Sequence, residues 1–122
     1  ACLYNIYVKY MGRKEIEKEY CKLTKEIESM CIYDGRNTVD RYVCEKCGGL
    51  LHTTYKDKGV TPFVITCPMC GGMMSHTQTF RKEIVPESVE IKNWFRPTLE
   101  QTLKMSDGTI EHILNGGLIL EE

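Results

Sequence analysis

The segments CEKCGG (residues 44–49) and CPMCGG (residues 67–72) repeat one pattern, a CxxC pair followed by two glycines, with nineteen residues between the pairs. A CxxC turn brings two sulfur atoms to one ion, and two such turns about fifteen to twenty residues apart complete a tetrahedral site. This spacing predicts a single zinc ion held by four thiolates. The predicted ligands are Cys44, Cys47, Cys67 and Cys70.

The glycines and the donor set predict the local backbone and the role of the metal. Gly48 and Gly71 stand where each turn must reverse, and glycine adopts the positive φ of such turns without a steric penalty. A site filled by four protein sulfurs has no open position for water or substrate. We therefore expect one structural Zn²⁺, no catalytic residues and no enzyme activity.

Length and composition are those of one soluble domain. The chain has 122 residues, of which 42% are hydrophobic and 27% charged, with no apolar run long enough to cross a bilayer. Its first residues lack the basic stretch and apolar core of a secretory signal. The three cysteines outside the metal motif, Cys2, Cys21 and Cys31, have no disulfide spacing, which favours a reducing compartment. We expect a cytoplasmic protein with no membrane partner and no small-molecule substrate.

Hydrophobic periodicity predicts an α+β fold in three parts. Residues 2–10 alternate like a short strand, and residues 13–30 carry an apolar stripe at helical spacing. We expect this amphipathic helix to pack on the metal-binding part. The stripe consists of Ile16, Tyr20, Leu23, Ile27 and Met30. The three parts are residues 1–39 with the strand and helix, residues 40–83 with a zinc ribbon, and residues 84–122 as a C-terminal extension.

The zinc ribbon is predicted to be a small antiparallel β core around the cysteines. Its four β-prone segments are residues 41–43, 50–55, 63–66 and 73–80.

The C-terminal extension is predicted to hold two short helices and a terminal strand. Thr98 and Gln101 have the spacing of a capping box, so a helix should begin there. Ser106 or Asp107 should begin the second helix. This helix should end in left-handed backbone at residues 115–117, before a strand at residues 118–120.

The order of motifs resembles small zinc-ribbon proteins of tailed bacteriophages, over roughly residues 40–122. The resemblance implies the same four cysteine ligands. It also implies a location in the cytoplasm of an infected bacterium or in the phage particle. Proteins of this kind generally lack an assigned activity, so it implies no substrate. The motifs that carry it are CxxCGG, KGVTPF (58–63), ITCPMCGG (65–72), WFRPT (94–98) and EHILNGGLIL (111–120).

These observations favour a non-enzymatic interaction module, acting as an assembly component or as an inhibitor of a host protein. Its partner would be another protein or a second copy of the chain. Trp94, Phe95 and Arg96 are the candidate contact residues, because tryptophan and arginine are enriched at the energetic centres of interfaces.

Two other functions remain open. One is a regulator that binds nucleic acid, although a net charge of −1 provides no strongly basic surface. The other is a thiol redox or zinc sensor, which requires labile thiolates. The basic residues for the first are Arg41, Lys46, Lys56, Lys58, Arg81 and Lys82, and the stacking aromatics are Tyr7, Tyr10, Tyr42, Tyr55, Phe63, Phe80, Trp94 and Phe95.

The three histidines stand apart, in the sequence, from any carboxylate or nucleophile in a recognisable pattern. His52, His76 and His112 are therefore expected to be exposed or structurally bonded rather than catalytic.

Overall fold

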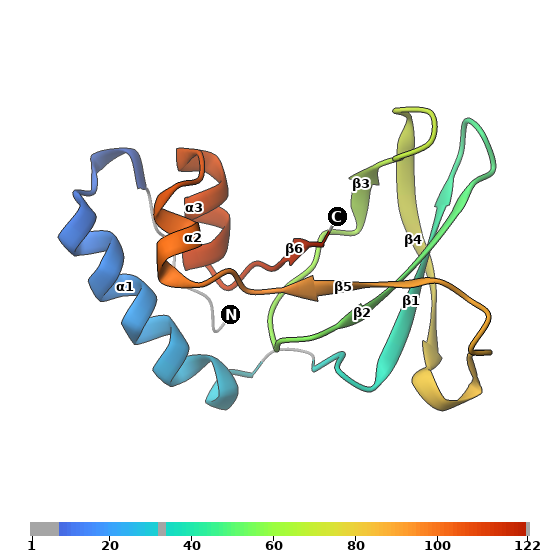
Figure 1. Cartoon of the computed structure of the whole chain (residues 1–122), viewed down its shortest axis with the longest axis horizontal. Helices are drawn as coiled ribbons and strands as arrows, with labels where there is room; N and C mark the ends of the chain where they lie inside the picture. Colours follow the sequence, from blue (N-terminus) through green and yellow to red (C-terminus); the bar gives the residue numbers. More distant parts are fainter. Residues whose placement is uncertain (1–7, 32–33, 122) are drawn as a thin grey trace.

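The computed structural model describes residues 8–31 and 34–121 and has an α+β fold. Figure 1 shows a curled sheet with the helices beside it. The strands lie side by side in the order β3-β4-β1-β2-β5-β6. They are β1 (Thr38–Cys44), β2 (Leu50–Tyr55), β3 (Val64–Thr66), β4 (Met73–Arg81), β5 (Ile91–Phe95) and β6 (Ile119–Leu120). The helices are α1 (Arg13–Glu26), α2 (Leu99–Leu103) and α3 (Asp107–Leu114), with 3₁₀ turns η1 (Val8–Tyr10), η2 (Ile27–Ser29) and η3 (Lys82–Ile84).

The four β-prone segments around the cysteines lie on β1, β2, β3 and β4, which pair antiparallel. The prediction of a purely antiparallel sheet is wrong, because β5 pairs with β2 in parallel. A parallel pair requires a long crossover, and here the chain passes through β3 and β4 before it returns beside β2. Strands from the C-terminal extension thus continue the same sheet as the cysteine-bearing strands.

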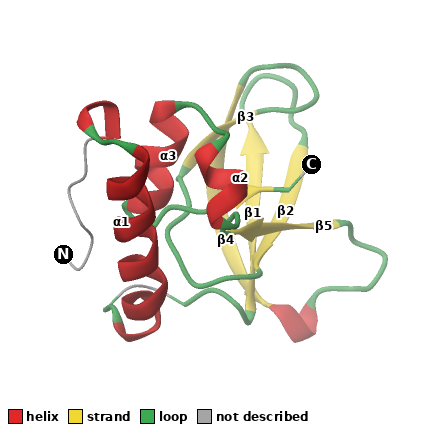
Figure 2. Cartoon of the chain, turned by 60° about the vertical axis from the view of Figure 1, so that its left-hand side comes forward, coloured by secondary structure: helices red, strands yellow, loops and turns green. Residues whose placement is uncertain are grey.

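The three α-helices form a layer of their own at one side of the sheet (Figure 2). The predicted amphipathic helix is confirmed as α1 followed by η2, and Ile16, Leu23 and Ile27 of its stripe are buried. It packs mainly on the C-terminal helices and not on the cysteine-bearing strands, since Ile16 joins Ile110 and Leu114 in one apolar cluster. Of the strand predicted at residues 2–10, residues 1–7 lie outside the described residues, and Val8–Tyr10 is a 3₁₀ turn.

The ends of the short helices follow from local chemistry. Thr98 and Gln101 form the predicted capping box at the start of α2, and the Ser106 side chain caps α3. Gly116 has a φ of +90° after α3, the left-handed backbone that the sequence predicted for this end. Among the described residues, no helix combines the length and apolar composition needed to span a membrane.

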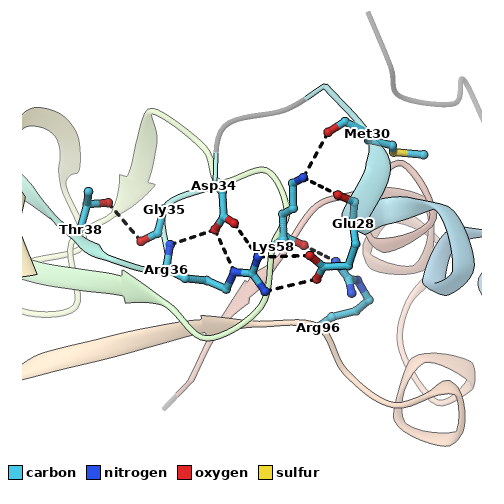
Figure 3. Close-up of polar contacts among 8 residues, drawn as sticks. All are labelled: Glu28, Met30, Asp34, Gly35, Arg36, Thr38, Lys58 and Arg96. Carbon is cyan, nitrogen blue, oxygen red and sulfur yellow. Dashed lines mark hydrogen bonds and ion pairs between the residues drawn. The ribbon is translucent and has the colours of Figure 1, made fainter.

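A polar network fastens the end of the helical layer to the sheet (Figure 3). The Lys58 ammonium donates to the backbone carbonyls of Glu28 and Met30, over 2.8 and 3.2 Å. The carboxylate of Glu28 also pairs with Arg36, and the Arg96 guanidinium donates to the Lys58 carbonyl. Because carbonyls at a helix end lack helical partners, a cation there satisfies them and interacts well with the helix dipole.

Candidate metal centre

The two CxxCGG segments form turns of the same geometry at the same end of the sheet, between β1 and β2 and between β3 and β4 (Figure 1). In the first turn Cys44 N–H donates to Gly49 O and Gly48 N–H donates to Cys44 O. In the second turn Cys67 and Gly71 donate in the same way, to Gly72 O and Cys67 O. Each turn therefore presents its two sulfurs in the same manner.

The predicted positive φ is confirmed at both reversal points, with +71° at Gly48 and +76° at Gly71. A side chain at either position would strain this backbone, although nothing lies within 4 Å of an added Cβ. The strain is therefore the only expected effect of a small substitution at these glycines.

Gly48→Ala and Gly71→Ala are each expected to lower the free energy of unfolding by about 1 kcal/mol. Thermal denaturation of the metal-loaded protein measures the change. Gly12→Ala is the matched control, because Gly12 also has open space for a Cβ and has a φ of −79°. Equal melting temperatures for the three variants would contradict the role given to the positive φ.

The four sulfurs meet in a cluster that could hold a metal ion. Cys44, Cys47, Cys67 and Cys70 each offer one Sγ, and these atoms all lie within 4.8 Å of one another. The Sγ atoms of Cys44 and Cys70 are 3.4 Å apart, and those of Cys47 and Cys67 are 3.7 Å apart. A disulfide has an S–S length of about 2.05 Å, whereas Zn–S bonds of about 2.3 Å in a tetrahedron separate the sulfurs by about 3.8 Å. The spacing fits a tetrahedral ion and no disulfide.

Backbone amides surround the sulfurs and set their acidity. Gly49 N–H donates to Cys47 Sγ and Gly72 N–H to Cys70 Sγ, both over 3.4 Å. The Cys47 N–H is the main cause that lowers the pKa of the Cys44 thiol to about 6. The Gly72 amide lowers the pKa of Cys70, but the bond to Cys44 and desolvation outweigh it and raise that pKa to about 12. Metal binding must displace the remaining protons, so affinity rises with pH.

The predicted contact residues Trp94, Phe95 and Arg96 lie on and just after β5. Trp94 is buried, with 4% of its surface exposed, and Phe95 is half-buried. The Arg96 side chain points into the polar network of Figure 3, where its Nη2 donates to Lys58 O. These three residues thus take part in internal contacts of the sheet and of the network.

The six predicted basic residues do not line one face. Lys46 lies in the first cysteine turn, whereas Arg81 pairs with Thr38 at the opposite end of β1. Lys58 is buried, and Arg41 stacks over the Phe80 ring and bonds to His52. Lys56 and Lys82 are exposed.

The predicted stacking aromatics also lie apart. Tyr7 falls outside the described residues, and Tyr42, Tyr55 and Trp94 are buried. Phe80 and Phe95 are half-buried, and only Tyr10 and Phe63 among the described members are strongly exposed.

The structure places one histidine beside a carboxylate, a contact that the sequence did not predict. His76 Nε2 lies 3.2 Å from Asp40 Oδ1, across 36 positions of the chain. Pairing of β1 with β4 creates this contact, so no local spacing in the sequence could have revealed it. The other two histidines are structurally bonded as expected, His52 to the Arg41 side chain and His112 to the Leu118 carbonyl.

Comparison with protein-family models, curated proteins and solved structures finds no match to this chain. The chemistry of the site therefore follows from its own geometry.

Proposed function

We propose that this chain is a non-enzymatic interaction module whose sheet is held at one end by a single structural Zn²⁺ ion. The observation that carries the proposal is the group of exposed apolar side chains around the thiol cluster. A closed four-sulfur site leaves no position for substrate, so its role is to fix the two turns. Side chains on and beside these turns then become a rigid contact surface.

The donor set supports zinc as the ion. Tetrahedral four-sulfur sites take zinc or iron, and closed sites of four cysteines are typical of structural zinc. The amides that donate to Cys47 and Cys70 are of the kind that orient and stabilise metal-bound thiolates. Elemental analysis of freshly purified protein is expected to give one zinc per chain and no iron.

The apolar surface at the metal end consists of four side chains, each within three positions of a cysteine ligand. Contiguous exposed apolar patches of soluble proteins commonly mark sites of protein contact, and methionine suits surfaces that adapt to a partner. Leu50 and Met69 border one groove of about 370 Å³, and Val64 and Met73 border another of about 420 Å³. The exposed fractions are 50% for Leu50, 48% for Val64, 59% for Met69 and 57% for Met73.

The partner is another protein or a second copy of the chain, in line with a role as an assembly component or as an inhibitor of a host protein. The resemblance to phage zinc-ribbon proteins supports an origin in a tailed phage and the cytoplasm of its bacterial host. Binding of nucleic acid has weaker support, because Lys46 and Arg81 lie at opposite ends of the sheet, Lys58 is buried, and Arg41 is held against Phe80 and His52.

The test compares two charged substitutions at the metal end with one in η3, just beyond the far end of β4. Met69→Asp and Met73→Asp should each weaken partner binding or self-association at least tenfold, since an aspartate must be desolvated in the contact. Ile84→Asp is the matched control, because Ile84 is 59% exposed and lies beyond Arg81, at the opposite end. Light scattering reports self-association, and affinity capture from bacterial extract with quantitative mass spectrometry reports a partner.

Equal effects of all three substitutions, with zinc content unchanged, would contradict a contact surface at the metal end. Retention on DNA or RNA that falls steeply with salt would instead favour the nucleic-acid alternative.

A further inference from the structure

A second polar site lies away from the metal, in a cavity of about 280 Å³ against the face of β1 and β4. The loop between β2 and β3 covers one side of this cavity. Its lining residues include the buried carboxylate of Asp40, His76, Thr79 and the rings of Tyr42, Tyr55 and Phe63.

A β-bulge assembles the polar part of the cavity. Tyr42 pairs with His76 and Arg41 pairs with Gln78, so Thr77 is an extra residue in β4. In a regular strand, side chains three positions apart, such as those of His76 and Thr79, point to opposite faces of the sheet. One extra residue between them places both side chains on the same face. His76 and Thr79 consequently both reach Asp40. Bulges are over-represented next to functional sites for this reason.

One carboxylate oxygen of Asp40 accepts hydrogen bonds, and the other has no hydrogen-bond partner among the described residues. Its side chain is 6% exposed, and Oδ1 lies 2.7 Å from the Thr79 hydroxyl, which donates, and 3.2 Å from His76 Nε2. Within the described residues, Asp40 Oδ2 has no hydrogen-bond partner, and it is not among the fully buried unpaired atoms. Because Asp40 lines the cavity and Oδ2 keeps some accessibility, this oxygen can accept a hydrogen bond from a ligand that brings a donor or a positive charge.

The same contacts argue against a nucleophilic triad. In such a triad one imidazole nitrogen takes the proton of the nucleophile while the other donates to the carboxylate. Here His76 Nε2 faces both Asp40 Oδ1 and Thr79 Oγ1, and the Thr79 hydroxyl already donates to Asp40. The hydroxyl is thus not activated by the imidazole, and the cluster is arranged to bind.

The aromatic rings and the lack of lysine and arginine in the described lining favour a positively charged ligand. His76 lies with its ring centroid 5.7 Å from that of Tyr42 and 6.0 Å from that of Phe63, and Tyr55 completes the aromatic lining. Among the described residues, neither lysine nor arginine lines the cavity, and the histidine there, His76, already faces the Asp40 carboxylate, so an anion would meet no unpaired cation. Aromatic faces attract cations, most strongly where water is excluded, and a carboxylate adds to this attraction.

We propose that this cavity binds an alkylammonium group, supplied by a lysine or methyllysine side chain of the protein partner. The inference rests on the proposed interaction function and gives the chemistry of one contact in it. The ammonium would approach the free Oδ2 of Asp40, and its alkyl groups would contact the rings of Phe63 and Tyr55. Phe63 is 77% exposed and forms the accessible side of the site.

The test uses the zinc-loaded protein, residues 1–122, and four probes in ¹⁵N NMR titrations. Choline supplies a quaternary ammonium, and 3,3-dimethylbutan-1-ol is its neutral isostere. A glycine-flanked peptide with trimethyllysine, compared with its leucine analogue, represents a partner side chain. Choline should bind about tenfold more tightly than the alcohol, with saturable shifts at residues 59–63 and 76–79. The trimethyllysine peptide should shift the same residues and the leucine peptide should not.

Three variants separate the carboxylate from the aromatic lining. Asp40→Asn keeps the shape of the side chain and should weaken choline binding about tenfold. Phe63→Leu keeps an apolar side chain without a π face and should weaken it several-fold. Glu87→Gln is the control for loss of an acidic group at an exposed position, and its affinity should equal that of the wild type. The fold of each variant is checked from its spectrum before titration.

Equal binding of choline and the alcohol would overturn the proposal, because the cavity would then select for apolar volume alone. Shifts confined to other residues would overturn it as well, as would unchanged affinity in both Asp40→Asn and Phe63→Leu. Binding of choline without the trimethyllysine peptide would overturn the assignment to a partner side chain. These measurements do not involve the metal-end substitutions, so failure of the cavity proposal can be told apart from failure of the contact surface at the metal end.

Discussion

Cys67→Ser is expected to release the metal and to unfold the cysteine-bearing end of the sheet. Cys67 is buried and its Sγ lies 3.7 Å from that of Cys47. Its loss therefore removes one of the four sulfur ligands on the buried side of the site. Structural zinc contributes roughly 10 kcal/mol or more to folding in small domains, against a total stability of roughly 5–15 kcal/mol. We expect metal content well below one per chain and a loss of cooperative melting in the sheet.

Native mass spectrometry measures the metal content, and near-ultraviolet circular dichroism follows the tertiary packing. Cys21→Ser is the matched control, because Cys21 is an exposed cysteine on α1, in a different layer from the thiol cluster. It should retain one metal ion and an unchanged melting temperature. A Cys67→Ser protein that keeps a full equivalent of metal and melts like the wild type would contradict the structural role of the ion.

Features fixed by short-range chemistry were predictable from the sequence. The repeated CxxCGG motif located the sulfur cluster and the two glycines with positive φ. The apolar stripe located α1, and the Thr98 capping box located the start of α2. In each case the residues that determine the feature lie within a few positions of one another, so spacing alone carries the information.

Features that depend on strand partners could not be predicted in this way. The parallel pairing of β5 with β2 joins segments more than thirty residues apart. The hydrophobic pattern of a strand does not show whether it will pair parallel or antiparallel. The contact of Asp40 with His76 depends on a β-bulge, and no pattern in the sequence predicts this bulge. The sequence predicts Lys58 on a charged surface, whereas the fold buries this residue and its ammonium donates to carbonyls of the helical layer.

Trp94 illustrates the same limit, because its residue type indicates a contact surface while its position indicates a core. The side chain is 4% exposed, its ring centroid lies 6.4 Å from that of Tyr42, and its neighbours in the sheet are Tyr55 and Leu120. Its indole N–H has no hydrogen-bond partner among the described residues. The ring therefore contributes apolar volume between β2 and β6, although burial of the unpaired indole N–H costs some free energy.

Trp94→Ala is consequently expected to lower the free energy of unfolding by about 3–5 kcal/mol, through lost burial and the remaining cavity. Trp94→Phe keeps most of the apolar volume and removes the unpaired N–H, so its loss should be smaller. Phe95→Ala, at the adjacent half-buried position, is the control for removal of an aromatic ring near the surface. Urea denaturation of the zinc-loaded proteins gives the three values. If Trp94→Ala unfolds at the same urea concentration as the wild type but loses its partner, Trp94 is a contact residue. The burial of its ring instead predicts that Trp94→Ala unfolds at a lower urea concentration.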